Sequence, residues 1–132
     1  MKITADTNVL VRAIVEDNLR QSETAQAELA GAEAIALALP ALCELVWVLS
    51  RGYEIPPMQI ADTIRRLIDG GNVMVNRRAV EAGLAVLVAG GDFADGVIAH
   101  EGRWLGGNIF VSFDRKATTL LEAGGEAARL LL

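Results

Sequence analysis

The acidic residues that could do chemistry lie at the ends of predicted strands, at the start of one predicted helix and inside another. They are Asp6, Glu44, Asp92, Asp95 and Asp114. Asp6 directly follows a predicted strand over residues 2–5, and Asp114 directly follows another over residues 109–113. Carboxylate oxygens are the ligands that Mg²⁺ and Mn²⁺ prefer in proteins. The pattern therefore predicts a site for a hard divalent cation.

Most of these acids also have a structural interpretation, and the sequence leaves both open. Asp6 and Asp114 are suited to cap the helix that follows each of them. Asp92 and Asp95 have the i, i+3 spacing of an N-cap and its capping-box partner before an apolar run. Taken singly, none of the four identifies a metal site.

Glu44 favours the chemical interpretation because it lies in the most apolar predicted helix of the chain. Its neighbours three and four positions away carry no charge: Pro40, Ala41, Trp47 and Val48. A half-buried glutamate without a local partner needs a cation, a distant arginine or a proton. We expect a metal or catalytic role, with Arg51, two turns further along the same face, as the alternative partner.

The composition restricts the kind of site further. The chain has 132 residues, enough for one domain, and contains a single cysteine, Cys43, and a single histidine, His100. These numbers exclude an internal disulfide, a thiolate-rich cluster and a histidine-based zinc site within one chain. The net charge of −5 argues against nonspecific binding of nucleic acid unless a cation reverses the local field. Without a readable secretory signal or membrane-spanning stretch, we expect a cytoplasmic protein with no membrane partner.

The elements that must position these residues alternate between strands and helices. The pattern predicts strands over residues 2–5, 34–39, 73–75 and 109–113. It predicts helices over residues 8–16, 21–30, 41–51, 56–69, 77–89, 94–105 and 115–122, while residues 127–132 fit either a strand or a helix end. This alternation predicts an α/β fold with a parallel sheet covered on both faces, in which the strand 109–113 is buried. Ligands of such sheets bind outside the carboxyl ends of the strands, so we expect Asp6 and Asp114 at one rim.

Carboxylates that converge at one rim need a compensating charge, because they cannot all stay ionised at neutral pH. A divalent cation supplies that charge, and it can polarise a phosphoryl oxygen, deprotonate a bound water and orient an in-line attack. Thr7 or Asn8 would form hydrogen bonds beside Asp6. Ser112 would orient Asp114 in the same way.

Four segments that contain these acids resemble the PIN-domain ribonucleases, in particular the VapC-type toxins of bacterial type II toxin–antitoxin pairs. They read D-T-N-V-L-V-R, A-L-C-E-L-V-W-V-L, G-D-F-A-D-G-V-I-A-H and I-F-V-S-F-D-R-K-A, and together they extend over nearly the whole chain. The resemblance implies a single PIN-like domain over residues 1–132, with a central parallel sheet of about four to five strands. It implies endonucleolytic cleavage of RNA, often tRNA or rRNA, with Mg²⁺ or Mn²⁺. It also implies a homodimer, inhibited by a small cognate antitoxin whose tail fills the active-site groove.

Matched to the family motifs, the first acidic position is Asp6, the second is Glu44 and the last is Asp114. The D-x-x-I-A pattern selects Asp95 as the main third ligand, and Asp92 matches an additional acid that many members carry. Where the last motif often has threonine, Ser112 keeps the hydroxyl group.

The resemblance assigns the RNA backbone to arginines, with exposed salt bridging as the alternative role for most of them. The candidates are Arg12, Arg51, Arg77, Arg78 and Arg115. Tyr53, Trp47 and Trp104 could each stack a base, although helical spacing favours the core or a dimer interface for Trp47. We expect His100 at the surface or in an interface.

Two other classes of protein also place acids at strand ends. A haloacid-dehalogenase-like, magnesium-dependent phosphohydrolase would need a second Asp two residues after Asp6, where this chain has Asn8. A receiver-like signalling domain would need paired acids near the start and a later lysine, for which Lys116 is poorly placed. A non-enzymatic interaction module would be favoured if no metal bound.

Overall fold

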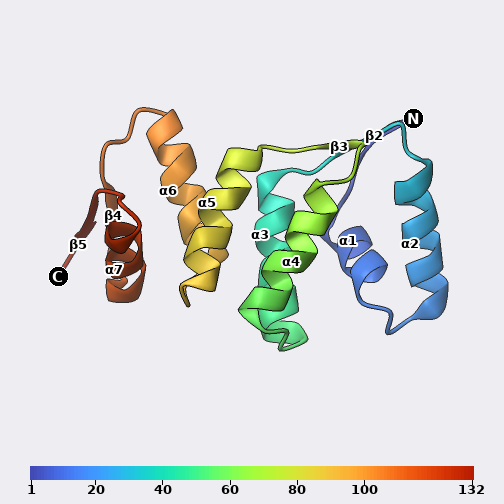
Figure 1. The fold of residues 1–132 in the computed structure, drawn as a ribbon, viewed down its shortest axis with the longest axis horizontal. Helices are drawn as coiled ribbons and strands as arrows, with labels where there is room; N and C mark the ends of the chain where they lie inside the picture. The colour runs from blue at the N-terminus through green and yellow to red at the C-terminus, as the bar shows by residue number, and fades with distance from the viewer. The chain divides into compact units, whose positions relative to one another are not determined.

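Strands and helices alternate along the chain in a computed structural model that describes residues 1–132, and they form two units, Met1–Asn76 and Arg77–Leu132 (Figure 1). The first unit contains β1 (Lys2–Thr4), α1 (Thr7–Ile14), α2 (Leu19–Gly31), β2 (Ala34–Ala36), α3 (Leu39–Trp47), the π-helix η1 (Val48–Gly52), α4 (Pro57–Ile68) and β3 (Val73–Met74). The second contains α5 (Arg77–Val88), α6 (Phe93–Trp104), β4 (Phe110–Ser112), α7 (Arg115–Ala123) and β5 (Ala128–Leu130). This organisation confirms the predicted α/β class.

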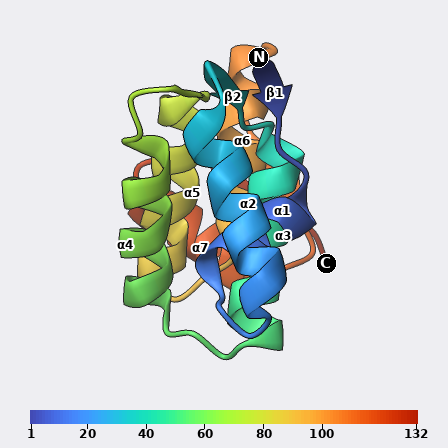
Figure 2. The same cartoon turned by 90° about the vertical axis from the view of Figure 1, so that its right-hand side faces the viewer.

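The first unit is built on a parallel three-stranded sheet in the order β1-β2-β3. Ile3 pairs with Ile35, and Ile35 pairs with Val73 on its other side. Parallel neighbours need long crossovers, which the helices between them provide, and β1 and β2 lie side by side in Figure 2. The largest fully buried side chains of this unit come from its helices: Leu10, Leu42, Leu45, Leu49, Ile60, Ile64 and Ile68. Helical apolar stripes therefore supply most of its core.

The second unit depends on the close packing of α5 against α6. A Cβ atom on Gly83 would come within 2.7 Å of the Phe93 ring, and one on Gly96 would come within 2.8 Å of the Gly83 Cα atom and collide with the Ala82 carbonyl oxygen. Glycine at both positions lets the two backbones approach, which fixes the turn of α6 that carries Asp95. Beside this pair, β4 and β5 form a parallel two-stranded sheet, with Val111 opposite Arg129.

The seven predicted helices all form, and most of their ends lie within two residues of the predicted ones. The largest difference is the helix predicted over residues 41–51, which ends as an α-helix at Trp47 and continues as η1. Its wider turn is closed by the Tyr53 N–H donating to the Val48 carbonyl oxygen at 3.2 Å. No helix combines the length and the apolar character needed to cross a lipid bilayer.

Two details of the predicted sheet are different in the structure. The strands, expected in one central sheet, form a three-stranded and a two-stranded sheet, and residues 127–132 contain a fifth strand, β5. The strand predicted over residues 109–113 was expected to be buried, but Val111 is 43% exposed and Phe113 75% exposed. In a two-stranded sheet alternate side chains face opposite sides, and in this one Phe110 packs with Val86 and Leu121 while Val111 points away.

Candidate active site

Asp6 connects β1 to α1 and has the extended backbone of a helix N-cap. Its Oδ1 accepts a hydrogen bond from the Thr7 backbone N–H at 2.8 Å. Asp6 therefore caps α1, as its position in the sequence suggested. This role does not exclude the chemical one, because the exposed carboxylate keeps its second oxygen free of this bond.

Thr7 contacts both candidate acids of the first unit, Asp6 and Glu44. Its side chain is buried, at 9% exposure, and its hydroxyl Oγ1 lies 3.2 Å from Glu44 Oε2 and 3.4 Å from the Ala41 carbonyl oxygen. Because the Thr7 N–H also bonds Asp6, one residue links a carboxylate at the start of α1 to another on α3. The hydroxyl predicted to lie beside Asp6 thus bonds the second acid of the predicted set.

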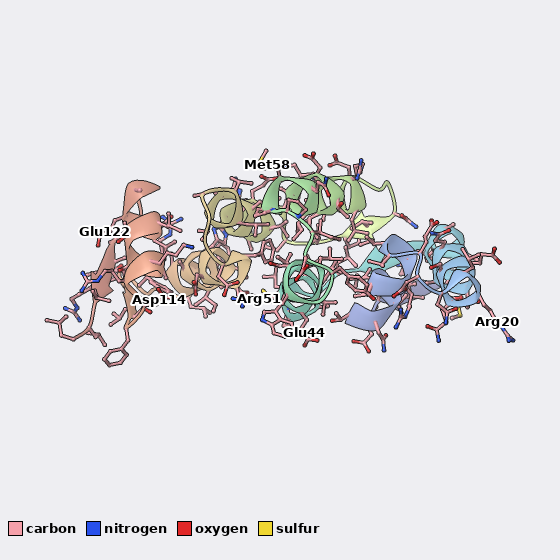
Figure 3. All side chains as sticks on the ribbon, turned by 90° about the horizontal axis from the view of Figure 1, so that it is seen from below. Arg20, Glu44, Arg51, Met58, Asp114 and Glu122 are labelled. Atoms are coloured by element: carbon pink, nitrogen blue, oxygen red, sulfur yellow. The ribbon has the colours of Figure 1, made fainter.

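Glu44 differs from its sequence-based description in two ways. It is exposed on α3, not half-buried (Figure 3). The buried positions of this helix are taken by Leu42, Leu45 and Val46. The partner of Glu44 is Thr7, which lies 37 positions away in the sequence. Arg51, the expected alternative, forms no ion pair with it and lies in η1, beyond the end of α3 at Trp47.

Asp6 and Glu44 open into a hollow of about 340 Å³ within the first unit. The other residues that line it are Thr7, Asn8, Val11, Arg12, Val48 and Tyr53. Two carboxylates, a hydroxyl, an amide, a guanidinium and a phenol therefore share one concave surface. We call this hollow the acid pocket.

Arg12 and Tyr53, both in the acid pocket, are joined by Asp17. Arg12 Nη1 donates to Asp17 Oδ1 at 2.9 Å, and the Tyr53 hydroxyl donates to Asp17 Oδ2, also at 2.9 Å. The hydrogen bond from Tyr53 and the charge of Arg12 lower the pKa of Asp17. The same hydrogen bond raises the pKa of Tyr53, so the phenol remains protonated and continues to donate. Asp17 was not singled out in the sequence because Tyr53, 36 positions away, is brought to it by the fold.

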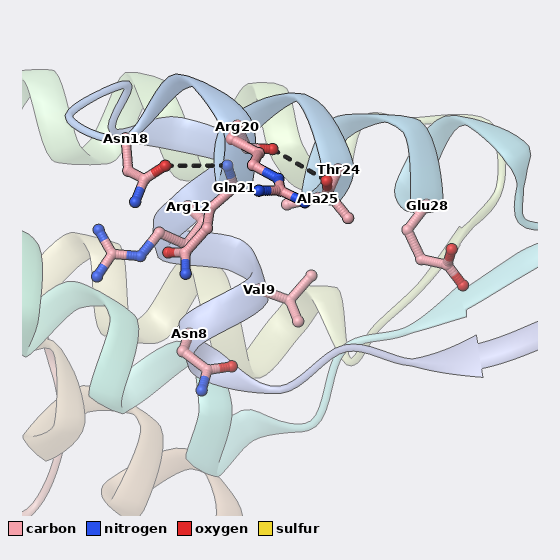
Figure 4. A pocket seen from close by; sticks show the side chains of 9 residues that line it. All are labelled: Asn8, Val9, Arg12, Asn18, Arg20, Gln21, Thr24, Ala25 and Glu28. Atoms are coloured by element: carbon pink, nitrogen blue, oxygen red, sulfur yellow. Dashed lines mark hydrogen bonds between the residues drawn. The ribbon is translucent and has the colours of Figure 1, made fainter.

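A larger hollow of about 890 Å³ lies between α1 and α2 (Figure 4). Its lining comprises Asn8, Val9, Arg12, Asn18, Arg20, Gln21, Thr24, Ala25 and Glu28. Asn8 and Arg12 also line the acid pocket, so the two hollows are adjacent. Arg20 and Thr24 were missed in the sequence, although their i, i+4 spacing on α2 marks one face of that helix.

The second unit contains the other three candidate acids, Asp92, Asp95 and Asp114. Asp92 is the N-cap of α6 by its backbone, but its exposed side chain makes no capping hydrogen bond. The prediction that the Asp92 carboxylate caps this helix is therefore wrong. Burial raises the pKa of Asp95, and the charges of Asp92 and then Asp114 raise it further. Asp95 is thus close enough to Asp92 and to Asp114 for their charges to act on it.

Asp114 caps α7, as its sequence position allowed. Its Oδ1 accepts from the Ala117 backbone N–H at 3.1 Å, and its own N–H donates to the Ser112 hydroxyl at 2.9 Å. Ser112 therefore holds the backbone at Asp114, and one carboxylate oxygen stays outside the capping bond. Arg115, the first residue of α7, is exposed next to it.

The other residues singled out in the sequence lie apart from these contacts. Arg51 is exposed on η1, and Trp47 is exposed by 60% on α3, so Trp47 does not belong to the core. Trp104 is largely exposed at the end of α6, and His100 is half-buried on the same helix.

The donor chemistry fits a hard divalent cation. Asp6 and Glu44 belong to the first unit, and Asp92, Asp95 and Asp114 to the second. Neither unit by itself gathers three or more Asp, Glu, His or Cys side chains into a group that could hold a metal ion. All five candidates offer carboxylate oxygen, and the mutual repulsion around Asp95 is the kind that a cation relieves.

Comparison with known protein families assigns the chain. The PIN domain matches residues 3–120, a range that includes all five acids, Thr7 and Ser112. No curated protein sequence matches the chain. PIN domains use divalent metal ions, usually Mg²⁺ or Mn²⁺, to cleave nucleic acids. The match extends over most of the 132 residues, and the chain therefore belongs to the PIN-domain family of metal-dependent nucleases.

Proposed function

We propose that this protein is a Mg²⁺- or Mn²⁺-dependent endoribonuclease, the toxin of a toxin–antitoxin pair. The observation that carries the nuclease assignment is the contact of Thr7 with both Asp6 and Glu44 inside a PIN domain. A buried residue whose N–H bonds one carboxylate and whose hydroxyl bonds another is well suited to hold both in a fixed orientation. Family membership favours this function over a phosphohydrolase or a receiver-like domain.

In this proposal Asp6, Glu44, Asp95 and Asp114 bind the ion, and Asp92 is an auxiliary ligand. A bound cation would neutralise the scissile phosphate and lower the pKa of the water that attacks it. Thr7 fixes Asp6 and Glu44, while Ser112 fixes the backbone at Asp114. No side-chain nucleophile is required, which agrees with the single Cys and single His of the chain.

The proposed substrate is RNA, of the tRNA or rRNA class, held through its phosphates. Arg12 lines the acid pocket, while Arg51 and Arg115 are exposed on η1 and α7. Guanidinium groups bind phosphate with two parallel hydrogen bonds, so they can hold the strand without reading its sequence. Their positions support Arg12 as the first of the three to test.

The decisive experiment for the nuclease function measures RNA cleavage by the purified protein with Mg²⁺, with Mn²⁺ and with a chelator. We expect cleavage only with a metal ion, and a loss of at least about 100-fold in Asp6→Asn, because removing one ligand weakens binding of the ion. Asp62→Asn, an exposed acid on α4, is the matched control and should cleave normally. Metal-dependent cleavage that survives in Asp6→Asn would refute the assignment.

The toxin role, the homodimer, the cytoplasmic location and the small antitoxin rest on the resemblance of the four motifs. Expression of the active chain should arrest growth, and Asp6→Asn should not. Co-expression of the neighbouring short reading frame should restore growth and yield a stable complex. Growth arrest by Asp6→Asn to the same degree would count against a toxin that acts through its nuclease activity.

A further inference from the structure

Asp17 joins two side chains of the acid pocket without lining it. Arg12 comes from the last turn of α1, and Tyr53 directly follows η1. Each carboxylate oxygen of Asp17 accepts one bond of 2.9 Å, Oδ1 from Arg12 and Oδ2 from the Tyr53 hydroxyl. Asp17 therefore fixes the separation of a guanidinium and an aromatic ring on the wall that also carries Asp6 and Glu44.

This cluster is poorly suited to stabilise the fold. The side chain of Arg12 is 37% exposed and that of Asp17 is 45% exposed, and ion pairs so open to solvent contribute little to stability. Arg12 and Tyr53 instead lie beside the predicted metal ligands Asp6 and Glu44, where an RNA substrate would bind.

The chemistry of the two side chains matches one nucleotide. With its hydroxyl bound to Asp17, Tyr53 is restrained at both ends and presents a ring on which a base can stack. Arg12 uses Nη1 for Asp17 and keeps other N–H donors for a phosphate. Trp47 and Trp104, the other two residues predicted to stack a base, do not line the acid pocket.

We propose that Asp17 is a positioning residue that holds Arg12 and Tyr53 as the binding wall for one nucleotide of a single-stranded RNA, next to the cleaved bond. Arg12 binds the phosphate, and the Tyr53 ring stacks on the base. The proposal rests on the proposed ribonuclease function, and it adds Asp17 and the coupling of its two partners to that function.

The test compares the kinetics of Asp17→Asn and Tyr53→Phe with those of the native protein on a short single-stranded RNA. Arg12 and Tyr53 are proposed to bind the RNA and not to take part in the chemical step. Asp17→Asn should therefore raise KM about 5- to 30-fold, as expected for a weakened stack and phosphate contact. It should leave kcat within about twofold. Tyr53→Phe keeps the ring and loses only the bond to Asp17, so its KM should rise less. Tyr53→Leu, which removes the ring, should match or exceed Asp17→Asn.

Glu23→Gln is the matched control, because Glu23 is an exposed acid on α2 that lines neither hollow. A readout independent of cleavage is the binding of the same RNA to each variant in the Asp6→Asn background, followed by fluorescence anisotropy. The dissociation constants should rise in the same order as KM, and the Mg²⁺ dependence of cleavage should not change.

Two results would overturn the inference. One is a KM of Asp17→Asn equal to that of Glu23→Gln, and the other is a fall in kcat with unchanged KM in Asp17→Asn and Tyr53→Phe. Failure of the native protein to cleave any RNA would instead refute the ribonuclease function, and this inference with it. Measuring RNA cleavage by the native protein therefore distinguishes a failure of the ribonuclease function from a failure of this inference.

Discussion

At the scale of single residues, Thr7 shows how one residue can bond two acids. Its backbone N–H bonds Asp6 and its hydroxyl bonds Glu44, so the N-cap of α1 and the exposed face of α3 are tied at one point. Because the hydroxyl is buried and the carboxylates are exposed, the contact orients the acids without neutralising them. This contact makes Thr7 a positioning residue in the proposed site.

Replacing Thr7 by Val keeps the shape and the N–H bond to Asp6 but removes the hydroxyl. We expect cleavage to fall about 10- to 100-fold, the usual cost of losing a residue that orients a metal ligand. Thr7→Ser should restore most of the activity. Thr63→Val, which removes a hydroxyl that bonds only the Gln59 carbonyl oxygen of its own helix, should cleave normally. Equal activity of Thr7→Val and Thr63→Val would contradict this role.

Asp95 gives a prediction about pH. Its pKa is raised above the ordinary value of 3.8, first by burial and then by Asp92 and Asp114, so the folded protein binds this proton more tightly than the unfolded chain. Ionised Asp95 therefore costs stability. This cost grows as the pH rises from 3.8 towards the raised pKa and is constant above it.

In a chelating buffer, Asp95→Asn should have a higher thermal midpoint than the native protein at neutral pH, and the difference should shrink as the pH falls towards 3.8. Mg²⁺ should then stabilise the native protein more than the variant. A thermal midpoint difference that is constant over the whole pH range would exclude this explanation.

At the scale of elements, the packing of α5 on α6 sets the position of Asp95. Gly83 and Gly96 face each other with no room for a Cβ atom on Gly96, because the Ala82 carbonyl oxygen and the Gly83 Cα atom occupy that space. The backbone of α6 therefore lies against α5 at the residue next to the proposed third ligand. A change in this packing would move the acid together with its helix.

Gly96→Ala should destabilise the protein by about 1–3 kcal/mol, the usual effect of overpacking, as measured by urea unfolding. Gly102→Ala is its control on the same helix, where nothing lies within 4 Å of the added carbon. That variant should be neutral or more stable by up to about 1 kcal/mol, because alanine favours the helix. The same loss of stability in both variants would show that close packing is not the cause.

At the scale of the whole molecule, the proposed metal ligands are divided between the two units, Asp6 and Glu44 in one and the three remaining acids in the other. The PIN domain nevertheless matches residues 3–120, which include parts of both units. The family match therefore includes the candidate acids of both units.

Asp6→Asn and Asp114→Asn should each reduce cleavage by at least about 100-fold, and the double variant should lose little more than either single one. Residues that act as a unit show this non-additive pattern. The measurement is the initial rate of RNA cleavage for all three variants at saturating Mg²⁺. Losses that multiply in the double variant would indicate that the two acids act independently.

The sequence by itself determined the α/β class, the seven helices and the junctions at which Asp6 and Asp114 follow their strands. It could do so because strand and helix periodicity, N-caps and helix stops are local signals, which act over a few residues. The order of the four acidic motifs also pointed to the PIN domain. A strand over 109–113 could be predicted from such local signals. Its exposure could not, because exposure depends on which elements pack against the strand.

Only the tertiary structure decided which side chains meet. Glu44 finds its partner in Thr7, 37 positions away, and Asp17 finds Tyr53, 36 positions away. The π-helical turn that contains Arg51 and the glycine contact between α5 and α6 were likewise not predicted from the sequence. Such contacts depend on how elements stack in three dimensions, and no local pattern encodes them. This is why the candidate acids were found in the sequence and Asp17, the partner of Arg12 and Tyr53, was not.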